Sequence, residues 1–290
     1  MTQHISKKTS VKEDNAYRVI LSNFSYDLRI LSELNVKLAK SIDEMKEQAN
    51  KAFHEKVKNL DPENKEKFLE FGKFLDSSQP KENRSFQLEG ELGQMVFDIA
   101  NEGVILPNRF FMFIRDMGLV YLVAQFDDFI KMSLEITFFT KTNMLSTCKK
   151  SVTFEELLKY RSLKTIKHEI IQKEAEEVAN KDIEELKVYF EEKMHIDISE
   201  FSDWLKLKER FYRRNILIHN SGFPNDIYKR KIGIKAPEIR KNERLTVSRE
   251  YLDESILMFK DFASKLVESL ENKFGKPPIN LRDKVKLITR

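Results

Sequence analysis

The chain has 290 residues, of which 41% are hydrophobic and 34% are charged, so it can bury a core and is not a disordered chain. Only 8 glycines and 7 prolines occur, which favours long helices with few tight turns and predicts an all-α fold. The net charge of +4 permits nucleic-acid binding without requiring it, and the single cysteine, Cys148, excludes an intramolecular disulfide and a cysteine-based zinc site.

The N-terminal third has the pattern of two helices and a linker. Apolar residues recur on one face over 14–57, and Asp61 followed by Pro62 predicts the start of a short helix that ends near Leu75. The polar stretch 76–84 is the clearest linker in the chain. We therefore predict three parts: an N-terminal helical segment and linker at 1–84, a helical domain at 85–275 and a basic tail at 276–290.

A central helix is predicted from Leu106 to about residue 139, after a helix near 86–101 that ends at Gly103. It is apolar nearly all round, as expected for a helix that is buried on most sides. Charged residues interrupt it, so no uncharged run reaches the roughly 18–20 residues of a membrane span. With no apolar run at the N-terminus and one cysteine, we expect a cytoplasmic protein that does not enter a membrane.

Helical patterns also fill most of the second half. Thr153 and Glu156 form a capping box, and the charged run 165–195 has a thin apolar edge, which predicts a solvent-facing helix or helical pair. A helix follows at about 200–220, and Ser248 caps a last amphipathic helix that ends near Phe274. Between these two helices, short apolar stretches allow one short β-hairpin near 231–247.

The helix at 200–220 carries an arginine where its pattern requires a core residue. Large apolar residues recur along one face at spacings of three and four: Trp204, Leu207, Phe211 and Ile218. The same spacing requires an apolar residue at position 214, which is Arg214. An arginine in this seam costs free energy unless it is paired or faces a polar cleft. Asn215 and His219 lie one turn apart, so this part of the helix offers a cation, an amide and an imidazole.

The pattern R-N-x-x-x-H from Arg214 to His219, followed by Gly222, resembles the signature of the HEPN superfamily, all-helical domains found in many prokaryotic ribonucleases and toxins. The resemblance covers about residues 105–275 and implies a helical bundle of HEPN type. It implies a homodimer, in which two copies of the motif face each other across one cleft. In one branch of the family a tyrosine two residues after the histidine is modified by a partner enzyme, but that position here is Ser221.

The activity that the resemblance implies is RNA cleavage in defence or stress, without a metal or other cofactor, leaving a 2′,3′-cyclic phosphate and a 5′-hydroxyl. Arg214, Asn215 and His219 are then the catalytic residues. The residue types suit this chemistry, because the pKa of histidine lies near neutrality and a guanidinium donates to two phosphate oxygens. Asn215 can orient the histidine or hold a phosphate oxygen.

Three further residues are predicted to support these catalytic groups. A buried arginine needs a carboxylate partner, and the central helix offers Asp127 and Asp128 in apolar sequence. An apolar seam leads to Asp127, so Asp127 is favoured, and this helix resembles the second helix of HEPN-type ribonucleases, where an aromatic–acid pair recurs. The third supporting residue is Arg213, next to Arg214.

A basic stretch at 229–244 follows the motif helix and can contact the RNA backbone, although an ordinary solvated loop explains it equally well. The residues predicted to bind RNA are Lys229, Arg230, Lys231 and Lys235. The scattered histidines form no credible metal site. A second interpretation is a non-catalytic RNA-binding, sensor or scaffold module that keeps the motif for folding or dimer contacts. Regulation by a partner protein or an activator stays open.

Overall fold

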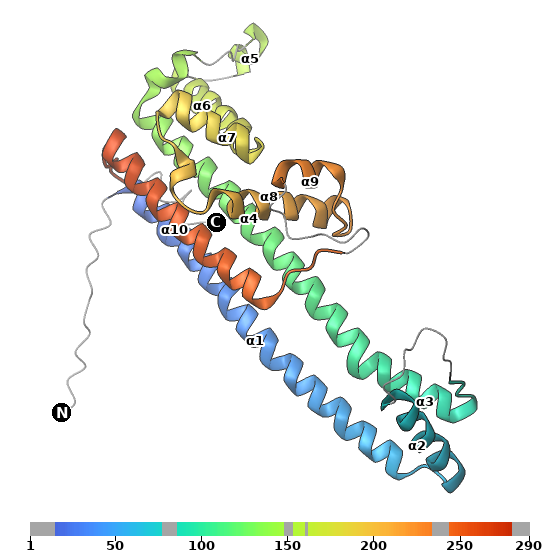
Figure 1. Cartoon of the computed structure of the whole chain (residues 1–290). Coiled ribbons are helices and arrows are strands. Elements are labelled where there is room, and N and C mark those ends of the chain that lie inside the picture. The colour runs from blue at the N-terminus through green and yellow to red at the C-terminus, as the bar shows by residue number, and fades with distance from the viewer. Residues whose placement is uncertain (1–14, 77–85, 148–152, 160–161, 234–243, 280–290) are drawn as a thin grey trace, which may run out of the picture. The chain divides into compact units, whose positions relative to one another are not determined.

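The protein is all-α in the parts of the chain that the structure describes (Figure 1). This computed structural model describes residues 15–76, 86–147, 153–159, 162–233 and 244–279. Within these ranges, helices are joined by turns and by short 3-10 and π segments, and no strand is present. No helix in these ranges has a sufficiently long apolar stretch to span a membrane.

The chain forms two compact units, and two long helices contribute to both of them. One unit contains residues up to Ser32 and from Gly118 onward, and the other is Glu33–Met117. The division therefore falls inside α1 (Ala16–Lys58) and inside α4 (Leu106–Thr140). The boundary expected after residue 84 does not coincide with it, because the sequence interpretation used a polar linker whereas the contacts divide continuous helices.

The first unit is a helical bundle with Phe126 at the centre of its core. The first half of α1, the second half of α4 and α10 (Arg249–Phe274) lie side by side (Figure 1). The ring centroid of Phe126 on α4 lies 6.1 Å from that of Phe24 on α1 and 4.9 Å from that of Phe259 on α10. It also lies 5.8 Å from Phe211 on α8 (Trp204–His219). These contacts fix α4 immediately before Asp127.

Shorter helices complete the first unit. They are α5 (Phe154–Lys159), α6 (Leu163–Ala179), α7 (Ile183–Tyr189) and α9 (Asp226–Ile232), with single turns at Thr142–Thr147, Phe190–Met194 and Ile198–Glu200. The charged run 165–195 is the expected helical pair, and its apolar edge reaches the core, with Ile171 and Phe190 fully buried. Ser162 and Asp182 cap α6 and α7 by accepting from backbone N–H groups.

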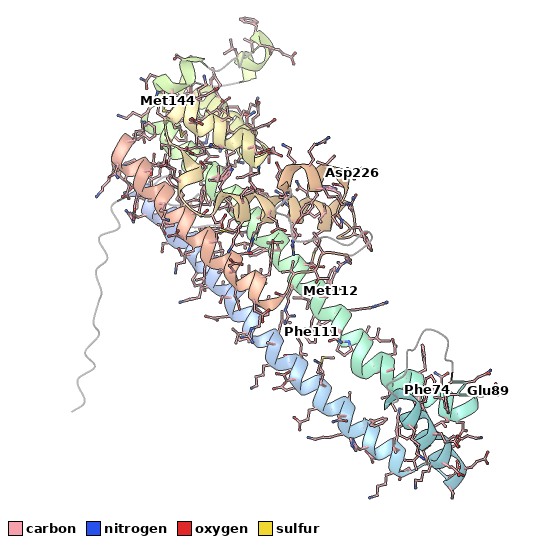
Figure 2. The ribbon with its side chains drawn as sticks, in the orientation of Figure 1. Phe74, Glu89, Phe111, Met112, Met144 and Asp226 are labelled. Carbon is pink, nitrogen blue, oxygen red and sulfur yellow. The ribbon has the colours of Figure 1, made fainter. Side chains whose placement is uncertain are left out.

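The second unit contains the second half of α1, α2 (Pro62–Asp76), α3 (Gly90–Ala100), a π segment (Asn101–Ile105) and the first half of α4. Phenylalanines join its elements: the ring centroids of Phe53 and Phe68 are 5.6 Å apart, and Phe86 lies 5.5 Å from Phe74 (Figure 2). None of the residues of the R-N-x-x-x-H motif lies in this unit.

The β-hairpin expected near 231–247 is wrong for the residues that the structure describes. Ile232 is the last residue of α9, and Leu245–Val247 form no strand. Instead, the N–H of Leu245 donates to the carbonyl of Gly222 at 2.9 Å, and Arg213 donates to the carbonyl of Thr246 at 3.0 Å. The segment after residue 243 is thus hydrogen bonded to α8 and to the turn that follows α8. Residues 234–243 lie outside the described ranges.

Candidate functional site

The motif residues occupy the last turns of α8. The helix begins after Asp203, whose carboxylate accepts from the N–H of Lys206 at 3.2 Å, because an N-cap acceptor satisfies a helix-end donor. It ends at His219, where the N–H of Gly222 returns to the carbonyl of Ile216 at 2.9 Å. Ser221 is left-handed there, with φ of 52°, as in other helix C-caps of this kind.

The apolar seam expected along α8 is correct in its first half and wrong at its end. Leu207 and Phe211 are buried, whereas Ile218 is 47% exposed. Ile216 and Leu217 are buried in its place. A repeat of 3.6 residues per turn drifts around the helix, so a strict three-four spacing loses the core face after a few turns. Arg214 therefore lies at the edge of the core rather than in it.

Arg214 is paired with Asp127, the acid that the sequence analysis favoured. The Arg214 Nη2 donates to Asp127 Oδ2 at 3.1 Å, and the two side chains are 27% and 31% exposed. Phe126 and Phe211, which contact each other in the core, place α4 and α8 for this pair. Asp128 faces a different neighbour: burial, and then the charge of Asp128, raise the pKa of Asp27 on α1.

Burial raises the pKa of Asp127 to about 6, and the attraction of Arg214 offsets only part of this rise. The cause is the loss of hydration around the charged carboxylate, which favours its neutral form. The ion pair is therefore about half formed near pH 6, is nearly complete only a unit or more above that value, and weakens as the pH falls. The carboxylate that holds Arg214 therefore has a pKa of about 6, within about one unit of neutral pH.

His219 and Asn215 are exposed on α8. Among the residues that the structure describes, none forms a hydrogen bond or an ion pair with either side chain. They are separated by one helical turn and are neighbours on the surface. Both can therefore meet a ligand from solvent; along α8, Asn215 directly follows Arg214 and His219 lies about 1.4 turns beyond it.

Arg213, which the sequence analysis predicted to support the catalytic groups, lies inside the core, a position that the sequence did not indicate. It is 8% exposed, and its Nε donates to Glu209 Oε1 at 2.6 Å. Glu209 also accepts from the hydroxyl of Tyr228 on α9 at 2.7 Å and from that of Tyr251 on α10. The guanidinium carbons of Arg213 and Arg210 each lie 4.2 Å from the ring centroid of Tyr251. The i, i+4 spacing of Glu209 and Arg213 signals such a pair, but spacing cannot show that it is buried.

The basic residues expected to bind RNA differ in their surroundings. Lys229 and Arg230 are exposed on α9, which begins at Asp226 (Figure 2). The Lys231 Nζ lies 2.7 Å from Glu184 Oε2, and hydrogen bonds from Lys208 and then Lys231 lower the pKa of Glu184 to about 2. Lys231 is thus held in an ion pair, and Lys235 lies outside the described ranges.

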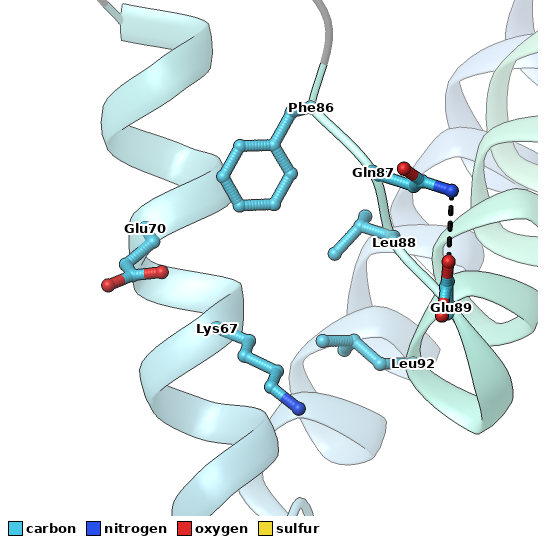
Figure 3. Close-up of a pocket in the computed structure, with 7 residues that line it drawn as sticks. All are labelled: Lys67, Glu70, Phe86, Gln87, Leu88, Glu89 and Leu92. Atoms are coloured by element: carbon cyan, nitrogen blue, oxygen red, sulfur yellow. Dashed lines mark hydrogen bonds between the residues drawn. The ribbon is translucent and has the colours of Figure 1, made fainter.

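A cavity of about 360 Å³ lies in the second unit (Figure 3). Its lining residues are Lys67, Glu70, Phe86, Gln87, Leu88, Glu89 and Leu92. Lys67 is hydrogen bonded to Glu63 at 2.8 Å, and Gln87 to Glu89 at 2.9 Å. The lining residues include no histidine, cysteine, serine or threonine. Within the described ranges, no group of three histidine, cysteine or carboxylate side chains is placed to hold a metal ion.

Comparison with known proteins identifies no relative: no family model, no curated protein and no solved structure matches the chain. The interpretation of the site therefore depends on its residues and their geometry. The central features are the half-exposed Arg214–Asp127 pair and the exposed side chains of Asn215 and His219 beside it.

The titration of Asp127 gives a prediction about stability. A native-state pKa of about 6 lies above the ordinary value of 3.8, so the folded state binds the proton more tightly than the unfolded chain. As the pH falls from 7 to 5, the free energy of unfolding of the wild type should therefore rise by about 1 kcal/mol relative to that of Asp127→Asn. Urea denaturation of both proteins at the two pH values measures this difference. A relative fall over the same range would contradict the raised pKa.

Replacement of the buried acceptor should be costly. Glu209→Gln removes the charge that pairs with buried Arg213, and we expect a loss of roughly 3 kcal/mol in the free energy of unfolding. The matched control is Glu254→Gln, because Glu254 pairs with the buried Arg210 but is itself 49% exposed. Loss of the Glu254 charge should lower the free energy of unfolding by less than about 1 kcal/mol. Equal losses in the two variants would contradict a central role for Glu209.

Proposed function

We propose that the protein is a metal-independent endoribonuclease of HEPN type that acts in defence or stress. The observation that carries this proposal is the partly buried Arg214, held by Asp127, with the exposed His219 five residues later on the same helix, about 1.4 turns away. A fixed cation beside an accessible imidazole is the minimal set of groups for cleavage of an RNA phosphodiester. Asn215 completes the set as a neutral donor and acceptor on the same turn.

In the proposed reaction the ribose 2′-oxygen attacks phosphorus and the bond from phosphorus to the 5′-oxygen breaks. One product ends in a 2′,3′-cyclic phosphate and the other in a 5′-hydroxyl. The 2′-hydroxyl loses a proton and the 5′-oxygen gains one, and imidazole suits both transfers because its pKa lies near neutrality. A homodimer that brings two copies of His219 to one cleft would supply a base and an acid together.

Arg214 would stabilise the charge that develops on the non-bridging phosphate oxygens. Its contact with Asp127 uses Nη2, whereas its Nε is buried and has no hydrogen-bond partner among the described residues. A buried donor without an acceptor costs free energy, and a catalytic role is one of the explanations for such a group in a native structure. Asp127 would act as a positioning residue, because it orients the guanidinium without touching the substrate.

The alternative is a non-catalytic RNA-binding, sensor or scaffold module that keeps the motif for folding or dimer contacts. A role in folding requires His219 to make contacts within the chain. His219 is exposed, and no described residue bonds to its side chain, which favours the catalytic role.

The decisive experiment incubates the purified protein with total RNA and defined oligonucleotides in EDTA. We expect cleavage by the wild type, with cyclic-phosphate ends, and a loss of at least about 100-fold in His219→Ala with an unchanged melting temperature. His54→Ala is the matched control, because His54 is an exposed histidine on α1 in the other unit. Cleavage at the full rate by His219→Ala would end the enzymatic assignment.

A double variant separates the two roles of Arg214. Arg214→Ala should abolish cleavage and also lower stability, because it leaves the half-buried Asp127 carboxylate without its cation. Adding Asp127→Asn should restore most of the lost stability, since no charge is then stranded, but no cleavage. Melting temperatures and cleavage rates of the wild type, both single variants and the double variant measure this. Recovery of cleavage in the double variant would contradict a direct role for Arg214.

A further inference from the structure

The turn that follows His219 is closed by backbone hydrogen bonds. The N–H groups of Asn220 and Gly222 both donate to the carbonyl of Ile216 at 2.9 Å, and the N–H of Phe223 donates to the carbonyl of Asn220 at 2.9 Å. The chain therefore folds back directly after the histidine. Phe223 is held four residues beyond His219 in a defined conformation, rather than on an extended loop.

The side chain of Phe223 is exposed in spite of this order. It is 45% exposed, and its apolar neighbours in the sequence, Ile218 and Ile227, are 47% and 56% exposed. A single exposed apolar side chain is ordinary on a protein surface. What distinguishes Phe223 is its place in an ordered turn, four residues beyond a candidate catalytic histidine. An aromatic ring suits nucleobases in particular, because every base has a π face that can stack on it.

Arg244, from a distant part of the sequence, lies across the same turn. Its Nε donates to the carbonyl of Ser221 at 2.9 Å. Gly222, with φ of +84°, allows this approach, since a Cβ at that position would lie 3.0 Å from the Cγ and the Nε of Arg244. A guanidinium is thus fixed between His219 and Phe223 along the chain, and Lys229 and Arg230 add exposed positive charge on the next helix.

We propose that this turn is a subsite for single-stranded RNA, in which Phe223 stacks on an unpaired nucleobase and Arg244 holds an adjacent phosphate. The inference rests on the proposed function, since it assigns the substrate class to the same site. A base within a duplex is stacked on both faces and cannot lie on the ring, so the subsite selects unpaired nucleotides that flank the cleaved bond. Phe223 and Arg244 are binding residues here, and neither takes part in proton transfer.

The test measures binding separately from cleavage. The probe is a fluorescently labelled ten-nucleotide RNA with 2′-fluoro riboses, which lacks the attacking hydroxyl, used alone and annealed to its complement. Fluorescence anisotropy with the full chain should show tighter binding of the single strand than of the duplex. Phe223→Ala should weaken single-strand binding by roughly fivefold or more. Phe223→Trp should retain it, whereas Phe223→Leu should behave like Phe223→Ala, because only an aromatic ring provides the stacking face.

The matched control is Phe154→Ala on α5, where a phenylalanine is 75% exposed, and its affinity should equal that of the wild type. Arg244→Gln should weaken binding and lower the slope of log affinity against log salt by about one, whereas Arg244→Lys should keep the slope. Melting temperatures accompany these variants, because Arg244 also braces the turn. An Arg244→Gln variant with the wild-type melting temperature and the wild-type salt slope would remove Arg244 from the subsite.

The inference and the proposed function fail in different ways. Equal single-strand affinity of Phe223→Ala and the wild type, a preference for the duplex, or no binding of either probe would overturn the subsite. If the wild type nevertheless cleaves RNA in EDTA, the proposed function stands without the subsite. Binding that depends on Phe223 in a protein that cleaves no RNA would keep the subsite and overturn the nuclease.

Discussion

The carboxylate of Glu209 is the acceptor around which the site-bearing helices are arranged. It accepts from Arg213 on its own helix, from Tyr228 on α9 and from Tyr251 on α10, so three helices meet at one buried charge. Such a charge is tolerated in a medium of low dielectric constant only when its lone pairs are used. The position of α8, and with it that of the R-N-x-x-x-H motif, follows from this network.

Two neighbouring arginines on α8 show how a structural pair differs from a candidate functional pair. Successive residues of a helix point about 100° apart, so Arg213 and Arg214 meet different partners. Arg213 bonds to Glu209 and to a backbone carbonyl in the core. Arg214 is 27% exposed, bonds to Asp127 through one nitrogen and keeps a buried Nε unused. Arg213 has acceptors for two of its nitrogens, whereas the buried Nε of Arg214 has none among the described residues.

The C-terminal end of α8 is where these constraints combine. His219 is the last helical residue, the turn behind it is closed onto Ile216, and Gly222 lets Arg244 approach that turn. Backbone hydrogen bonds and a positive φ order the turn, so the exposed ring of Phe223 is not what holds it. The proposed nuclease and the proposed single-strand subsite both depend on this local geometry, with α4 contributing Asp127 from the opposite side of the pair.

Local pattern was sufficient for the all-α class and the extents of the long helices, because helical periodicity and caps operate within a few residues. The pairing of Arg214 with Asp127, 87 positions away, was expected from chemistry rather than from spacing, because a buried arginine needs a carboxylate. Packing between distant segments decided the rest. It put Ile218 in solvent, buried Arg213 against Tyr251, bound Lys231 to Glu184 and replaced the expected hairpin by contacts with the turn at Gly222. The partners of Arg213 and Lys231 across the bundle are 38 and 47 positions away in the sequence, and no local spacing encodes such a distance.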